Sequence, residues 1–134
     1  MRLPSFLLAA SLLGVAVVAA AQTTPRAPAT GAAAEIAQGR RLFIRCAACH
    51  AIAPTTQVKI GPNLQGVFGR RAGTLAGFNY SAAMRSSTIR WDEATLDRWL
   101  QRPQTVVPGT TMAFAGLTNP ADRRALIAYL RRPN

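Results

Sequence analysis

Residues 46–50 read Cys-Ala-Ala-Cys-His, and this stretch decides how the rest of the chain is interpreted. The spacing C-x-x-C-H is the attachment motif for covalently bound haem. On a helical turn, positions i, i+3 and i+4 lie on one face, so two sulfurs and an imidazole can meet the same side of a flat macrocycle. The thiols of Cys46 and Cys49 would add to the porphyrin vinyl groups, and His50 would ligate the iron. We therefore expect one covalent haem c.

Three other uses of a C-x-x-C pair are open to this chain. A thioredoxin-like redox site lies in a β-α-β pattern, and no such pattern surrounds residues 46–49. A structural zinc ion takes four ligands, whereas the chain has 2 Cys and 1 His. A short-loop disulfide between Cys46 and Cys49 is an alternative in an oxidising compartment. The histidine directly after the second cysteine favours haem attachment over all three.

A second axial ligand can be sought by elimination. His50 is the only histidine, which excludes two histidine ligands from one chain. Of the three methionines, Met1 lies in a segment that we expect to be removed, and Met84 is more typical of a packing or surface residue. Met112 follows Pro108 and Gly109, which favour a rigid extended loop. We predict that Met112 and His50 are the metal ligands, a pair that raises the reduction potential and closes both axial positions.

The start of the chain has the pattern of an export signal. A basic start precedes an apolar run over residues 6–21 that ends in Ala-Ala-Ala, after which signal peptidase cuts. The run is shorter than the roughly 20 apolar residues of a membrane-spanning helix, although an uncleaved anchor is the alternative. Residues 22–33 are rich in Pro, Thr and Ala and indicate a flexible linker. We expect a signal peptide at 1–21, a periplasmic product and one folded domain at 34–134.

The chain is strongly basic. Its 16 Lys and Arg residues outweigh 5 Asp and Glu, for a formal net charge of +11, and Lys59 is the only lysine. Such a charge favours acidic partners. Export, the scattered positions of the arginines and the absence of a nucleic-acid-binding motif argue against a nucleic-acid partner.

The periodicity indicates an all-α protein. We expect a first helix over 34–45, a middle helix from about 92 to 101 that Pro103 stops, and a last helix after Asn119 and Pro120. Residues 81–84 suit one short helical turn. Residues 51–79 contain glycines and prolines without a sustained period, which indicates a long loop that could wrap a cofactor.

Several stretches, in order along the chain, make residues 34–134 resemble the class I c-type cytochromes, the soluble relatives of mitochondrial cytochrome c. They are residues 39–43 (GRRLF), 45–50 (RCAACH), 61–70 (GPNLQGVFGR), 77–81 (GFNYS), Trp91, 108–116 (PGTTMAFAG) and 122–130. The resemblance implies an all-α fold with crossed N- and C-terminal helices, shorter middle helices and long loops around one haem. It also implies that Gly39 lets the first helix approach the Leu126 face of the last.

The resemblance further implies roles for individual residues. The carbonyl of Pro62 would accept the imidazole N–H of His50, a bond that fixes the ring and raises its basicity as a ligand. Four residues match positions that hydrogen-bond the haem propionates: Arg70, Tyr80, Trp91 and Thr110. Asn63, Thr110 and Trp99 match positions close to the buried haem, and Phe114 matches one near its exposed edge.

The chain also departs from the family pattern. Trp99 aligns with a residue that is usually Tyr, and Gln104, Thr105 and Thr111 occupy positions that are often Lys in the mitochondrial protein. Positive charge near the haem edge would come from Arg45, Lys59 and Arg102.

The resemblance implies a periplasmic single-haem electron carrier and not an enzyme. Its partners would be redox proteins with acidic docking faces, such as membrane oxidase or reductase complexes or a periplasmic dehydrogenase. Stable membrane insertion is not expected if the signal is cleaved. One alternative is the cytochrome subunit of a dehydrogenase complex. Another is a gas sensor or peroxidase-like enzyme in which Met112 is displaced.

Overall fold

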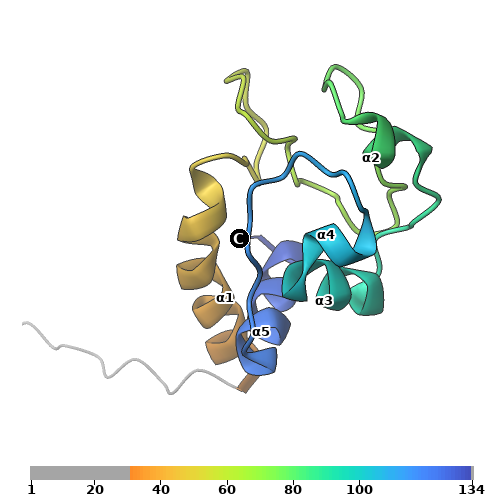
Figure 1. Cartoon of the computed structure of the whole chain (residues 1–134). Helices are drawn as coiled ribbons and strands as arrows, with labels where there is room; N and C mark the ends of the chain where they lie inside the picture. The colour runs from red at the N-terminus through yellow and green to blue at the C-terminus, as the bar shows by residue number, and fades with distance from the viewer. Residues whose placement is uncertain (1–30, 134) are drawn as a thin grey trace, which may run out of the picture.

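The computed structural model describes residues 31–133, which form an all-helical domain (Figure 1). The helices are α1 (Gly31–Ala47), α2 (Ala82–Ser86), α3 (Glu93–Gln101), α4 (Pro103–Val106) and α5 (Pro120–Arg131). The expected signal peptide at 1–21 and most of the expected linker at 22–33 lie outside the described residues. The first helix begins at Gly31, three residues before the expected domain boundary at residue 34.

Helices α1 and α5 pack closely against each other, and Gly39 lies at their contact (Figure 1). A Cβ atom on Gly39 would lie 1.9 Å from the carbonyl oxygen of Ala125 and 2.7 Å from the Cβ of Tyr129. No side chain fits in that space, so glycine sets how closely the helices approach. The close approach of Gly39 to the last helix that the resemblance implied is thus present, and its nearest atoms belong to Ala125 and Tyr129. The rings of Phe43 and Tyr129 extend the same contact, with centroids 5.5 Å apart.

Local signals fix the ends of α3, α4 and α5. Asp92 caps α3 through a reciprocal pair of hydrogen bonds with Thr95. Asn119 caps α5, and Pro120 occupies its first turn, as predicted. The sequence interpretation of Pro103 was incomplete: α3 ends before it, but Pro103 also begins the short helix α4, because proline suits a first helical position.

The segment between α1 and α2 is loop and turn throughout, as predicted for residues 51–79. Its one β-type contact is an isolated antiparallel bridge between Arg71 and Arg90, which joins the loop to the segment before α3. Helix α2 is short, and the side-chain oxygen of Ser81 caps it by accepting from the backbone N–H of Met84.

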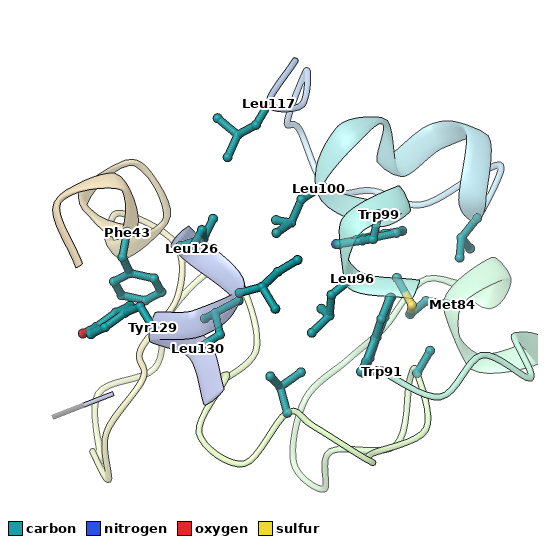
Figure 2. Close-up of a cluster of buried hydrophobic side chains, with 14 residues drawn as sticks. Phe43, Met84, Trp91, Leu96, Trp99, Leu100, Leu117, Leu126, Tyr129 and Leu130 are labelled. Atoms are coloured by element: carbon teal, nitrogen blue, oxygen red, sulfur yellow. The ribbon is translucent and has the colours of Figure 1, made fainter. Parts of the chain in front are cut away.

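The buried core extends from α1 across α5 to α3 (Figure 2). Side chains of α5, among them Leu126 and Leu130, face those of α3, among them Leu96 and Leu100. The buried guanidinium of Arg123 fastens α5 to α3, because its Nε lies 2.7 Å from Oδ1 of Asp97. Within residues 31–133, no helix combines the length and the apolar character needed to cross a membrane.

Candidate haem site

A cavity of about 400 Å³ opens beside this core. Its walls come from the end of α1, the long loop, α2, α3, the segment after α4, and α5. Most of the lining side chains are apolar or aromatic, and the charged ones are two arginines, Arg45 and Arg70. Cavities of this size and character bind small molecules and cofactors. Nine of the ten predicted site residues line it: Cys46, Cys49, His50, Pro62, Arg70, Tyr80, Trp91, Thr110 and Met112.

Cys46 and Cys49 reach the cavity from the end of α1. The backbone N–H groups of Cys49 and His50 both donate to the carbonyl of Cys46, at 3.0 and 2.8 Å, so the helical turn continues through the motif. The two thiols are not joined to each other in a disulfide. Burial raises the pKa of the Cys46 thiol, and the nearby Arg45 charge acts in the opposite direction. In the part of the chain that the structure describes, no three His, Cys, Asp or Glu side chains cluster to hold a metal ion.

The imidazole of His50 is held in place by the loop. Its Nδ1 lies 2.8 Å from the carbonyl oxygen of Pro62, which is the bond that the family resemblance implied. This bond assigns the proton to Nδ1 and leaves Nε2 available as a metal ligand. Burial lowers the pKa of His50, the bond to Pro62 raises it, and the charge of Lys59 lowers it.

Gly61 explains how the ring and the loop come so close together. A Cβ atom at Gly61 would lie 2.4 Å from Cε1 and 2.6 Å from Nδ1 of His50. The backbone N–H of Gly61 donates to the carbonyl of Cys49 at 2.8 Å, which fixes the loop against the motif. The sequence interpretation placed Gly61 in a matching stretch but gave it no role, because only the folded loop shows the contact.

Two methionines line the same cavity. Met112 is half-buried in the extended segment after α4, and its backbone N–H donates to Oγ1 of Thr110 at 3.4 Å. Met84 is buried on α2, and Figure 2 places it next to Trp91 and Trp99, whose ring centroids are 5.2 Å apart. The expectation that Met84 serves in packing agrees with this burial, although the sequence did not place Met84 at the cavity.

Two of the predicted propionate-binding residues bring polar groups to the cavity. Arg70 lines it, and its guanidinium donates to the carbonyls of Asn63 at 3.0 Å and Gln65 at 3.3 Å. Tyr80 also lines it, and burial raises the pKa of its hydroxyl while the Arg70 charge lowers it. Arg70 therefore carries positive charge at the cavity wall in a fixed position.

Asn63 is the predicted site residue that the structure does not bring to the cavity. Its Nδ2 donates to the carbonyl of Ala53 at 2.8 Å, and its Oδ1 accepts the N–H of Gln65 at 2.8 Å. Both bonds stay within the long loop. The Asn63 side chain therefore braces the loop, and the backbone carbonyl of Asn63 also accepts from Arg70.

Comparison with known proteins identifies the family. The cytochrome c family model matches residues 36–132. The chain belongs to the cytochrome c family. Cytochrome c2 from Rhodomicrobium vannielii is 48% identical over 99 residues, covering 74% of this chain and 79% of that protein. Cytochrome c2 from Rhodoblastus acidophilus is 49% identical over 92 residues, covering 69% of this chain and 86% of that protein.

A solved structure agrees with the family at the level of the fold. Cytochrome cH from Methylobacterium extorquens superimposes with a TM-score of 0.67 at 39% identity, covering 72% of this chain and 96% of that one. The chain is thus a class I c-type cytochrome with an all-α fold, and it is an electron carrier and not an enzyme. Its cofactor is one covalently attached haem c.

The cavity of this cytochrome fits that cofactor. A porphyrin is flat and apolar with two acidic propionates, and the wall is apolar with Arg45 and Arg70 and contains no Asp or Glu. The motif places two thiols beside an imidazole whose Nε2 is available. These are the groups that covalent attachment and axial ligation require.

Lys59 contributes in a way that the sequence did not predict. Its ammonium donates to the carbonyl of Ala47, the last residue of α1. A cation at a helix C-terminus satisfies an unpaired carbonyl and complements the helix dipole. Lys59 therefore secures the loop to α1.

Proposed function

We propose that this cytochrome is a diffusible periplasmic carrier that moves one electron at a time between redox partners, with His50 and Met112 as the axial ligands. The observation that carries the proposal is the convergence on one cavity of the Cys46, Cys49 and His50 motif and of Met112 from a separate segment. Haem, when bound, supplies an iron that alternates between its ferric and ferrous states.

The protein's part in this transfer is to hold its ligands still. The bond from His50 to the Pro62 carbonyl and the contact with Gly61 prevent the imidazole from turning. A thioether from Met112 would favour the reduced iron and close the remaining axial position. With His50 and Met112 as its two protein ligands, the iron would have no free position for a small-molecule substrate, and this would suit outer-sphere transfer.

We further propose that residues 1–21 are a signal peptide and that residues 22–33 include a linker to the folded domain. Its partners are redox proteins with acidic docking faces. Arg45 and Arg102 are exposed and would supply positive charge for docking, whereas the Lys59 ammonium is bound to Ala47. Electron transfer to such a partner should slow as salt rises, because screening weakens electrostatic steering.

A matched pair of variants tests the axial ligand. We expect Met112→Ala to open an iron position, change the absorption spectrum and lower the midpoint potential of the haem protein. The control is Met84→Ala, which removes the other thioether of the cavity and should leave the ligand set unchanged. An unchanged spectrum and potential in Met112→Ala, or a larger change in Met84→Ala, would contradict the assignment.

Cell fractionation tests the location, and purification tests the mode of action. The proposal expects the mature chain to begin at Gln22, to appear in the periplasmic fraction and to purify alone. Constant association with a larger cofactor-bearing subunit would instead favour the cytochrome subunit of a dehydrogenase complex. Rapid carbon monoxide binding by the reduced protein at neutral pH would favour a gas sensor or a peroxidase-like enzyme.

A further inference from the structure

Arg123 is the one charged residue that is buried within residues 31–133, with 6% of its surface exposed. Burying a charge is costly unless the group is paired and hydrogen-bonded, so a guanidinium in this position needs a physical reason. Arg123 does not line the haem cavity, so direct contact with the cofactor is not that reason. The atoms to which it donates indicate another role.

All three nitrogen atoms of the Arg123 guanidinium form hydrogen bonds. Nε and Nη2 donate to Oδ1 and Oδ2 of Asp97, at 2.7 and 3.4 Å. Nη1 donates to the backbone carbonyls of Leu117 and Thr118, both at 2.9 Å. One planar group on α5 therefore binds α3 and also binds the segment between α4 and α5.

Each element that Arg123 joins contributes residues to the wall of the haem cavity. Leu126 comes from α5, Trp99 and Leu100 come from α3, and Met112 comes from the segment between α4 and α5. Because Arg123 itself is not part of the wall, it joins these three parts from outside the cavity.

The chain that follows Met112 packs against the end of α3. A Cβ atom on Gly116 would overlap the carbonyl oxygen of Gln101, so only glycine allows this contact. The backbone N–H of Leu117 donates to the carbonyl of Leu100 at 2.8 Å. The buried guanidinium reinforces the same contact from both sides, because it binds α3 through a carboxylate and the segment through two carbonyls.

We propose that Arg123 is a positioning residue that keeps the Met112 thioether on the haem iron. This inference rests on the proposed role of Met112 as an axial ligand. The segment cannot move away from α3 without breaking bonds to a buried charge, and leaving such a charge without its partners is strongly unfavourable. Arginine suits this role because its planar fork holds five N–H donors in a fixed geometry, whereas lysine presents one flexible ammonium.

The rate of carbon monoxide binding to the reduced haem protein, without denaturant, measures how often Met112 leaves the iron. Arg123→Lys keeps the positive charge and loses the fork, and it should increase this rate about tenfold, the effect of losing one hydrogen bond to a charged group. The matched control is Arg131→Lys, the same change in the exposed ion pair between Arg131 and Glu93. That pair also joins α5 to α3, and an exposed ion pair contributes little, so the rate should not change.

Phe43→Leu distinguishes positioning of the ligand from a general loss of stability. Phe43 is buried in the contact between α1 and α5 and does not line the cavity. Its replacement should lower the free energy of unfolding and leave the rate of carbon monoxide binding unchanged. An equal increase in Phe43→Leu or Arg131→Lys would show general loosening of the fold and overturn the inference.

Asp97→Asn keeps the inference testable if Arg123→Lys fails to fold. The amide oxygen can still accept from Arg123, but the charge that holds the guanidinium is lost. The rate should increase by a smaller factor than in Arg123→Lys, and an unchanged rate in Asp97→Asn would overturn positioning through the ion pair.

Met112→Ala separates this inference from the proposed function. Fast carbon monoxide binding by Met112→Ala, with an unchanged rate in Arg123→Lys, would keep Met112 as the ligand and overturn only the role of Arg123. Slow binding by Met112→Ala, with an unchanged absorption spectrum, would overturn the ligand assignment and this inference with it.

Discussion

Two regions of the cavity present the proposed axial ligands in different ways. The histidine wall (residues 46–62) fixes the ligand itself, because the His50 ring bonds to the Pro62 carbonyl and touches Gly61. The methionine segment (residues 107–119) is extended and is anchored on either side of its ligand. The Gln104 side chain donates to the carbonyl of Thr110 at 2.9 Å, and the N–H of Leu117 donates to the carbonyl of Leu100 at 2.8 Å.

The difference suggests that the two proposed ligands have different roles. The histidine wall would give a ligand that short contacts orient in advance, whereas the methionine segment would present its thioether from a span between two anchors. Loss of His50 should therefore lower the yield of assembled haem protein. Loss of Met112 should instead change the midpoint potential of the iron.

The largest expected effect comes from removing each ligand in turn. His50→Ala should nearly abolish the yield of haem protein, because the iron loses the ligand that lies beside the attachment cysteines. Met112→Ala should keep its covalent haem. The measurement is haem content per polypeptide after expression in a host competent for haem attachment. Equal yields of the two variants would remove the distinction between the two regions.

A smaller but clear effect is expected from Gly61→Ala. The added methyl group would overlap the His50 ring, and overpacking of this kind lowers the free energy of unfolding by about 1–3 kcal/mol. Chemical denaturation of the haem protein measures the change. Gly31→Ala is the control, because a Cβ there meets nothing within 4 Å. If Gly61→Ala were as stable as Gly31→Ala, the histidine wall would be less tightly fixed than its contacts indicate.

The methionine segment should be less sensitive to the loss of one hydrogen bond. Thr110→Val removes the hydroxyl that accepts the Met112 N–H at 3.4 Å, and we expect a decrease of about 0.5–1.5 kcal/mol in the free energy of unfolding. Denaturant titration provides the measurement, with the exposed Thr118→Val as the control. A decrease larger than that of Gly61→Ala would reverse the comparison.

The smallest effect concerns α3, whose Trp99 and Leu100 also line the cavity. Hydrogen bonds from the backbone and side chain of Thr95 lower the pKa of Asp92 below its ordinary value of 3.8. A carboxyl whose pKa is lower in the folded state adds stability above its unfolded pKa, and that stability is lost as pH falls through the folded pKa. Asp92→Asn keeps an N-cap but cannot titrate, so it should show a smaller loss of stability below about pH 4. If the stability of Asp92→Asn and that of the original protein fall equally as pH is lowered, this assignment is wrong.

The sequence predicted those features that depend on neighbouring residues. The motif at 46–50, the cap at Asn119 with Pro120, and the end of α3 before Pro103 are local signals, and the structure confirms the corresponding elements. Helix α4 was missed because the same proline was interpreted only as a stop signal.

Contacts between segments that are distant in the chain could not be predicted from the sequence alone. The hydrogen bond from Lys59 to Ala47 and the loop-bracing bonds of Asn63 join segments whose proximity only the fold creates. The family resemblance supplied the bond between His50 and Pro62, which no periodicity in the chain could have indicated.

The most direct test of the account asks whether haem stays with the polypeptide when the fold is removed. The protein, made in a host competent for haem attachment, is denatured, extracted with acidified organic solvent and examined by absorption spectroscopy. The account predicts one haem per chain that remains with the protein through thioether bonds to Cys46 and Cys49. A colourless polypeptide with both cysteines free, or joined to each other, would contradict it.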